Sequence, residues 1–307
     1  MTVFPLRTAE ELDCVKPDRF YWRCIQCGRA LDVPQGVSGQ DACPACGYEY
    51  SYEPDFFRTS FHLLLFEKYK KQYLINRALN NNAYLSYVFI PDRSVSLLER
   101  EDVKLFRDFV REQLIEGPVL DNGCGPLPLP GYLNIPSLFE DRDVFGLDPM
   151  DKISFQGFRV LGCAEFTPFP DAYLQNIIFA TSLDHVVSLD QTVKETWRIL
   201  RSGGRVIIWM GDRSRSLVQR IRGWIFSTIK SLQAGYNVRR YGIYPELKLV
   251  LYIPHGAYDA YHSWAESPGK IKSLMIRSGF KLIEERKPVR NQAYLCFAKP
   301  STGASVK

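Results

Sequence analysis

The chain has 307 residues, of which 46% are hydrophobic, and a formal net charge of +5. This length suits one α/β domain with a smaller module, and the composition is typical of a protein with a buried core. The charge is too small over this length to indicate nucleic-acid binding by itself, and no apolar run approaches the ~20 residues that a membrane span needs.

The first residues do not have the pattern of a secretion signal. Residues 1–13 include the charged side chains Arg7, Glu10 and Glu11 and no apolar stretch. Secretion signals instead place a basic start before a continuous apolar region. We therefore expect a cytoplasmic protein.

Four of the eight cysteines form a C-x2-C-x15-C-x2-C pattern: Cys24, Cys27, Cys43 and Cys46. Glycine follows the second cysteine of each pair, as it does in knuckle-like turns. Four thiolates at this spacing are typical of a closed, tetrahedral Zn²⁺ site with a structural role. Two redox pairs are the less favoured alternative. We therefore predict a zinc ribbon over residues 1–54.

Aromatic side chains surround the predicted ribbon, and two interpretations fit them. They either cover the metal in a module too small to have a core of its own, or they form a stacking platform for a base or sugar. The first is favoured. The residues concerned are Phe20, Tyr21, Trp22, Tyr48, Tyr50 and Tyr52.

Residues 55–116 have mainly helical periodicity and form a predicted linker. One apolar stripe includes Phe61, Leu64, Leu65, Lys68 and Tyr69, and a second includes Leu97, Leu98, Phe106, Phe109, Val110 and Leu114. The run Asn80–Asn82 predicts a break between two elements. On periodicity alone, these helices pack the ribbon onto the domain that follows.

Residues 119–126 (V-L-D-N-G-C-G-P) read as the end of a buried strand, a glycine turn and a helix start. Glycine in such a turn allows positive φ and close approach of a ligand to the backbone. A second apolar strand, residues 144–148, ends in a carboxylate about twenty positions later, as in sites where an acid binds ribose hydroxyls. Together the two strands predict a nucleotide-type crevice.

Further motifs follow in order: A-E-F-T-P-F-P-D at 164–171, an apolar run at 174–180, L-D-H-V at 183–186 and R-I-L-R-S-G-G at 198–204. Strands are predicted at 119–121, 144–148, 159–162, 177–180 and 205–210. Because they alternate with helices, the sheet should be parallel, with ligands at the carboxyl ends of its strands. Residues 280–285 and 293–298 should add an antiparallel hairpin at its edge.

In this order the motifs resemble the class I S-adenosylmethionine-dependent methyltransferases of the methyltransferase 11 type, over about residues 117–210. The resemblance implies a Rossmann-like α/β fold with a mostly parallel sheet and an antiparallel last strand. It also implies a helical lid ahead of the first strand, as an alternative to simple packing. The cofactor it implies is S-adenosylmethionine, bound by Asp121, Asn122, Gly123, Cys124, Gly125, Asp148, Pro149, Ala164, Glu165 and Thr181.

The sequence departs from the family pattern in two places. Leu127 stands where a further glycine is common, and Pro126, Pro128, Pro130 and Pro136 crowd the predicted first helix. Proline breaks helix interiors, so this helix should be short or late. The acid that the family often places before Ala-Glu is also missing, because that position is a cysteine, Cys163.

The methyltransferase domain is predicted over 117–300, with a basic insertion at 212–262 and a tail at 301–307. The insertion carries an apolar helical stripe: Leu217, Ile221, Trp224, Ile225, Thr228, Ile229 and Leu232. It fits a cap over the substrate cleft, an amphipathic helix on a membrane surface, or a phosphate-binding surface for RNA or a nucleotide-linked sugar. The cap is favoured.

Histidine suits the removal of a proton from a methyl acceptor near neutral pH. His262 is the first candidate, since Asp259 three residues before it could orient the ring. His255 is the second and His185, within the L-D-H-V motif, the third. A metal pair formed by His255 and His262 is the alternative, although the sequence shows no third ligand.

The favoured function is methyl transfer to a small-molecule or glycan acceptor, with oxygen as the acceptor atom. A base methyltransferase of rRNA or tRNA is the second hypothesis. Some such enzymes, the bacterial large-subunit guanine methyltransferases, also pair this fold with an N-terminal zinc module. Against this hypothesis, the pattern of that group resembles C-x2-C followed by C-x3-H, whereas here both halves are C-x2-C. A pseudo-methyltransferase with the ribbon as an interaction module is the third.

Overall fold

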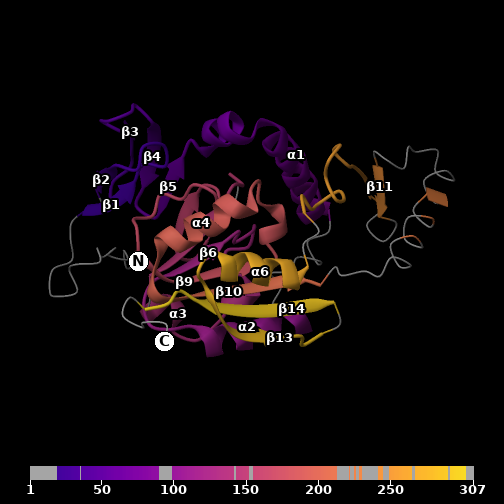
Figure 1. Ribbon diagram of the computed structural model, residues 1–307. Helices are drawn as coiled ribbons and strands as arrows, with labels where there is room; N and C mark the ends of the chain where they lie inside the picture. Colours follow the sequence, from indigo (N-terminus) through magenta and orange to yellow (C-terminus); the bar gives the residue numbers. More distant parts are fainter. Residues whose placement is uncertain are drawn as a thin grey trace.

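A ten-stranded sheet runs through the centre of the protein, flanked by helices on both faces (Figure 1). The computed structural model describes residues 19–34, 36–89, 99–141, 143–151, 155–212, 221, 225, 228–229, 241–244, 249–264, 267–289 and 291–301. The strands of the sheet follow the order β13 (Lys281–Arg286), β14 (Gln292–Ala298), β10 (Leu200–Gly211), β9 (Leu174–Ala180), β6 (Val119–Asn122), β7 (Val144–Asp148), β8 (Phe158–Leu161), β5 (Phe56–Thr59), β4 (Glu49–Glu53) and β3 (Gly39–Ala42).

The strands from β10 to β5 are parallel to one another, and the hairpin of β13 and β14 adds antiparallel strands at one edge. The predicted fold class, a mostly parallel Rossmann-like sheet with an antiparallel last strand, is therefore confirmed. Each strand expected from residue 119 onward is present, with ends shifted by a few residues at most, except that β10 begins five residues early.

Alternate residues of the central strands point to opposite faces of the sheet and form two cores. Leu120 and Ile177 belong to the first, together with residues of α1 (Phe61–Phe89), α4 (Leu189–Ile199) and α6 (Pro268–Arg277). Val119 and Ile178, their neighbours in sequence, belong to the second, with residues of α2 (Glu101–Gln113), η2 (Gly131–Leu133) and α3 (Leu138–Asp141). The result is a three-layer arrangement in which both faces of the parallel strands are buried.

The proline-rich segment after β6 forms no long helix, as predicted. Between β6 and β7 the described residues contain only the 3-10 turn η2 and the four-residue α3. Proline lacks the backbone N–H of a helix interior and collides with the preceding turn. The first turn of the crevice is therefore followed by loop backbone instead of a helix N-terminus.

The described part of residues 55–116 is mostly helical, as predicted, but one expectation is wrong and the segment also contains a strand. Asn80–Asn82 do not break the chain, because α1 continues through them, and its kink lies at Tyr69 (φ −138°, ψ 38°) instead. Residues 56–59 are not helical but form β5, which pairs with β8 in parallel. The central sheet therefore extends across the predicted boundary at residue 54 into β4 and β3.

The N-terminal module packs against the main domain through its aromatic side chains. Besides β3 and β4 it contains the hairpin of β1 (Arg19–Arg23) and β2 (Ala30–Pro34). Trp22 stacks on Phe57 with ring centroids 4.4 Å apart, and Tyr48 and Tyr50 are also buried. These rings fill a core, which favours the covering role over a stacking platform for a base.

Most of the basic insertion lies outside the described residues, so its predicted role as a cap stays a prediction. Of its apolar stripe, the structure describes Ile221, Ile225 and Ile229, which are exposed, and Thr228. The insertion also contains the hairpin of β11 (Tyr241–Tyr244) and β12 (Leu249–Tyr252). Within the described ranges, no helix has both the length and the apolar character required to cross a bilayer.

Replacing Trp22 by alanine should leave a cavity between the N-terminal module and the sheet. We expect the free energy of unfolding to fall by about 3–5 kcal/mol, as for other buried Trp or Phe residues cut back to alanine. Urea denaturation in zinc-containing buffer, followed by circular dichroism, measures the loss. Val37→Ala in the same module is the control: Val37 is 48% exposed, and its truncation should cost less than about 0.5 kcal/mol. Equal losses for both variants would contradict the buried position of Trp22.

Candidate active site

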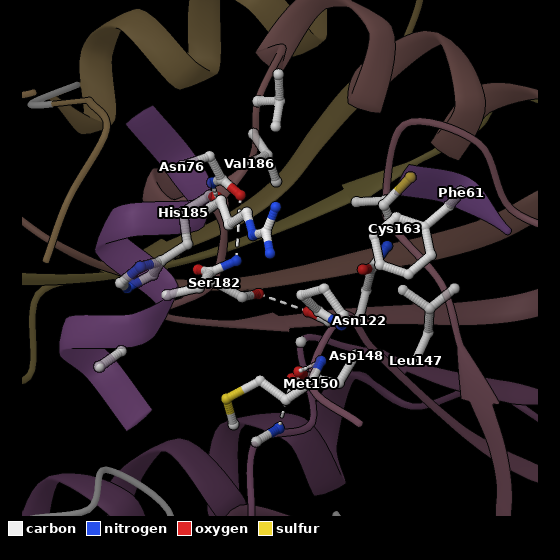
Figure 2. Close-up of a pocket in the computed structure, with 18 of the residues that line it drawn as sticks. Phe61, Asn76, Asn122, Leu147, Asp148, Met150, Cys163, Ser182, His185 and Val186 are labelled. Atoms are coloured by element: carbon white, nitrogen blue, oxygen red, sulfur yellow. Dashed lines mark hydrogen bonds between the residues drawn. The ribbon is translucent and has the colours of Figure 1, made fainter. Parts of the chain in front are cut away.

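A cavity of about 350 Å³ lies at the carboxyl ends of β6, β7 and β9, against α1 (Figure 2). Its volume falls in the range of small-molecule sites, and its position is the edge of an open α/β sheet where ligands bind. The predicted cofactor-binding residues that line it are Asn122, Gly123, Gly125, Asp148, Pro149, Ala164, Glu165 and Thr181.

The turn after β6 is built around a glycine that no other residue could replace without strain. Gly123 has φ +89°, and a Cβ added there would lie 2.4 Å from the Cβ of Ser182. The Ser182 hydroxyl donates a hydrogen bond of 2.5 Å to the Asn122 carbonyl, as Figure 2 shows. The ends of β6 and β9 are thus held together at the cavity wall, and Gly123 leaves room for this approach.

Asp148 ends β7 with its carboxylate at the cavity. The N–H of Gly125 donates to Oδ2 (3.0 Å), and the N–H of Met150 donates to Oδ1 (2.9 Å). Burial raises the pKa of this carboxyl, although these N–H groups and the charge of Arg159 act in the opposite direction. Each carboxylate oxygen has a second lone pair, so the side chain can still accept hydrogen bonds from a ligand.

Asp121 and Cys124 lie beneath this surface and do not line the cavity. Both are fully buried, and the Tyr132 hydroxyl donates to Asp121 Oδ2 over 2.9 Å. Burial raises the pKa of the Asp121 carboxyl to about 8, although the Tyr132 hydrogen bond opposes the shift. Asp121 therefore supports the turn from below, and neither Asp121 nor Cys124 faces the cavity, where both were predicted to bind the cofactor.

Glu165 and Thr181 lie on the part of the cavity wall between the end of β9 and the start of α4. The Glu165 carboxylate accepts hydrogen bonds from the backbone N–H groups of Val187 and Ser188, which lead into α4. Thr181, at the end of β9, has φ +57°. That conformation is rare for a β-branched residue and is found mainly where surrounding structure enforces it, often at functional sites.

A polar face of α1 forms the opposite wall, and the sequence did not reveal it. It consists of His62, Asn76, Arg77, Asn80 and Asn81. The Asn76 amide donates to the carbonyl of His185, which ties α1 to the 3-10 turn η3 (Leu183–His185). The sequence signal for this wall was the run Asn80–Asn82, interpreted above as a break. Asn76 and Asn80 are four residues apart, so their amides lie on one face of the helix and line the cavity. The structure thus places α1 where a lid would be.

The predicted catalytic histidines do not all come together. His185 lines the cavity, and its ring lies 4.9 Å from that of His262, centroid to centroid. His262 Nδ1 is 2.8 Å from Asp259 Oδ1 and 2.9 Å from Oδ2, so the predicted orienting pair is present. Burial would raise the pKa of the Asp259 carboxyl, but the hydrogen bond and charge of His262 hold it below its usual value. His255 is exposed and does not line the cavity.

The four cysteines of the N-terminal module converge as predicted. Their sulfurs lie within 4.8 Å of one another, with 3.7 Å between Cys24 and Cys46 and 3.6 Å between Cys27 and Cys43. A tetrahedral ion with Zn–S bonds of ~2.3 Å would separate its sulfurs by ~3.7 Å. In each cysteine pair, the N–H of the glycine after the second cysteine donates a hydrogen bond to the carbonyl of the first. The geometry fits a four-thiolate site.

Comparison with known proteins agrees with the position of the crevice. Residues 120–208 match a family model described as a methyltransferase domain. This part of the chain is similar to that family. The match spans β6 to most of β10, and so it includes the turn at Gly123 and the carboxylate of Asp148.

Several solved structures are similar to this chain at a low level, and a search of curated proteins gave no match. One is the PH0226 protein from Pyrococcus horikoshii (17% identity, TM-score 0.46, 69% of this chain and 97% of that chain covered). Another is a SAM-dependent methyltransferase from Thermotoga maritima (18%, 0.40, 78% and 97%). A third is a SAM-dependent methyltransferase from Methanosarcina mazei (14%, 0.43, 63% and 97%). These likenesses are too distant to carry an argument about the acceptor.

Asp121 should make the stability of the protein depend on pH. The folded state raises the pKa of its carboxyl from 3.8 to about 8, so folded molecules bind a proton that unfolded ones have released. The contribution of Asp121 to the free energy of unfolding should therefore be largest at acidic pH and fall between about pH 4 and 8. Asp121→Asn removes this contribution, so stability should decline less steeply, or rise more steeply, with pH than in the unmodified protein. Urea denaturation at several pH values in that window measures both slopes, and identical slopes would contradict the assignment.

Proposed function

We propose that the protein is an S-adenosylmethionine-dependent methyltransferase that acts on a hydroxyl group of a small-molecule or glycan acceptor. The observation that carries the proposal is the buried Asp148 carboxylate at the end of β7, facing a cavity of small-molecule size within the region that matches the methyltransferase family.

The residues present fit this cofactor. The free lone pairs of Asp148 suit the two ribose hydroxyls, and Gly123 and Gly125 allow the cofactor to approach the backbone closely. Arg77 on α1 lines the same cavity and would pair with the methionine carboxylate. At the adenine end, Cys163 and Ala164 form the wall, so backbone groups and apolar contact replace an acidic side chain.

S-adenosylmethionine, when bound, supplies a methyl group on a positively charged sulfur. An acceptor hydroxyl would take up this methyl group and lose its proton. The protein mainly has to hold the two in line, and His185 at the cavity wall would take the hydroxyl proton. The ring of His262, oriented by Asp259, packs against the ring of His185 and does not line the cavity.

A small acceptor is favoured over RNA because the N-terminal module offers few of its aromatic rings to a base. Trp22, Tyr48 and Tyr50 are buried in the core, where they cannot stack on a nucleotide. RNA therefore remains the less favoured partner. Binding to a membrane surface would use the basic insertion, most of which lies outside the described residues. We also propose a cytoplasmic location.

The four cysteines are proposed to bind one structural Zn²⁺. A closed four-thiolate site has no open position for a substrate, so its role is to fold the module. The module contributes β3 and β4 to the central sheet. Loss of the ion should therefore disturb the sheet edge that leads through β5 to β8.

Asp148→Ala should weaken binding of S-adenosylmethionine by about 1–3 kcal/mol, or about 5- to 150-fold, because the ribose hydroxyls lose their acceptor. Isothermal titration calorimetry of the purified protein measures this. Asp190→Ala, which removes an exposed acid of α4 outside the cavity, should bind as the unmodified protein does. If the unmodified protein does not bind the cofactor although its zinc site is filled, the pseudo-methyltransferase hypothesis is favoured.

Cys43→Ser should lose one equivalent of zinc and lower the temperature of unfolding, since the site loses a thiolate ligand. Elemental analysis of the untagged protein counts the metal, and calorimetry follows unfolding. Cys296→Ala is the matched control, because Cys296 is a buried cysteine in β14, far along the sheet from the cluster. It should keep all of its zinc. Full retention of zinc by Cys43→Ser would refute the four-thiolate site.

A further inference from the structure

A second group of metal-binding side chains lies beside the cavity, formed by Asp184, His185 and His262. One potential ligand atom from each of them lies within 4.8 Å of the others. Asp184 and His185 belong to η3, directly after β9, whereas His262 lies 77 residues further along the chain. The sequence suggested His255 and His262 as a metal pair without a third ligand. In the structure, His262 instead meets two residues of the L-D-H-V motif, Asp184 and His185.

The spacing of these atoms suits an ion better than direct hydrogen bonds. His185 Nε2 lies 3.6 Å from Asp184 Oδ1, and His262 Nε2 lies 3.7 Å from Asp184 Oδ2. Hydrogen bonds between nitrogen and oxygen span ~2.7–3.2 Å. Ligands about 2.0–2.1 Å from a tetrahedral ion are ~3.3 Å apart, so small side-chain movements would complete the coordination. The two imidazoles approach the carboxylate through different oxygens, Oδ1 for His185 and Oδ2 for His262.

The ring of His262 is already oriented for binding. Its Nδ1 lies within hydrogen-bond distance of both carboxylate oxygens of Asp259, and Asp259 Oδ1 also accepts from the N–H groups of Tyr261 and His262. A proton on Nδ1 leaves a lone pair on Nε2, which lies 3.7 Å from Asp184 Oδ2. A carboxylate is one of the usual partners of the other ring nitrogen of a histidine that binds a metal.

The backbone fixes the two halves of the group relative to each other. The N–H of Ser263 donates to the carbonyl of Asp184 over 3.0 Å, which joins the segment of His262 to η3. The Trp264 indole donates to the Val186 carbonyl over 2.8 Å on the other side of His185. The three side chains are 21–30% exposed, so an ion could enter and still meet a site held by its surroundings.

We infer that Asp184, His185 and His262 bind one divalent transition-metal ion, of the zinc, manganese or iron(II) class. Two imidazoles and one carboxylate suit these ions and leave coordination positions open. His185 lines the cofactor cavity, so an open position would face the place of the acceptor. A use for the ion there rests on the proposed methyl transfer, and the ion would replace His185 as the group that activates the acceptor: it would hold the acceptor hydroxyl and lower its pKa.

Metal counting on the untagged full-length protein tests the inference. After exposure to zinc and removal of free metal, the unmodified protein should retain two equivalents, and His262→Ala and Asp184→Ala one. His255→Ala is the matched control and should retain two, because His255 lies outside the group. Circular dichroism checks that each variant folds. A single equivalent in the unmodified protein, removed by Cys43→Ser, would overturn the inference, and so would two equivalents in a folded His262→Ala.

A spectroscopic measurement separates the two sites even if a ligand variant folds poorly. With zinc in the cysteine site, added cobalt(II) should give visible bands without thiolate charge transfer, as nitrogen and oxygen ligands require. Asp259→Asn, which keeps all three ligands, should weaken cobalt binding by about 10- to 100-fold. Unchanged affinity in Asp259→Asn, or cobalt bands with thiolate character only, would count against the site.

These readouts do not depend on methyl transfer. A protein that binds the second metal but no S-adenosylmethionine would refute the proposed function and leave the metal site standing. A protein that holds one metal equivalent, binds the cofactor and methylates an acceptor at a rate that chelators do not change would refute the metal site and support the proposed function. In that case His185 acts as a base without an ion.

Discussion

The parallel pairing of β9, β6 and β7 is the constraint on which the rest of the molecule depends. Parallel strands end at the same edge, so residues far apart in sequence meet there: Gly123 after β6, Asp148 at the end of β7 and Thr181 after β9. The short contact between Gly123 and Ser182 and the hydrogen bonds to Asp148 are consequences of that edge. Every group proposed to bind the cofactor lies on it or faces it from α1.

The sequence predicted the strands and the crevice well because both have a local signal. A strand buried on both faces reads as a short apolar run, and the glycine turn and terminal acid follow it directly. Asp121 shows the limit of such motifs. The pattern indicates an acid at the strand end, but only the packing of Tyr132 shows that the side chain faces inward. A motif therefore gives the position of the backbone more reliably than the direction of a side chain.

The parts that the sequence missed depend on contacts between distant segments. Near Asn76 and Arg77, only the run Asn80–Asn82 indicates the polar face of α1, and the kink at Tyr69 has no proline or glycine to announce it. Likewise, β5 has few residues and gains its partner from β8, about a hundred positions later. His262 could be paired with Asp259 from their spacing, but its meeting with Asp184 needed the complete fold.

The missing first helix and the polar face of α1 belong together. A helix N-terminus after the glycine turn normally favours an anionic ligand group through its N–H groups and dipole. Here the prolines leave only η2 and α3 between β6 and β7, so that source of positive potential is absent from the described segment. The guanidinium of Arg77, on the opposite wall, can serve the same ligand group with a full charge. Since α1 is tied to η3 through Asn76, movement of this helix would change cofactor binding and the position of His185 at once, which couples the two halves of the site.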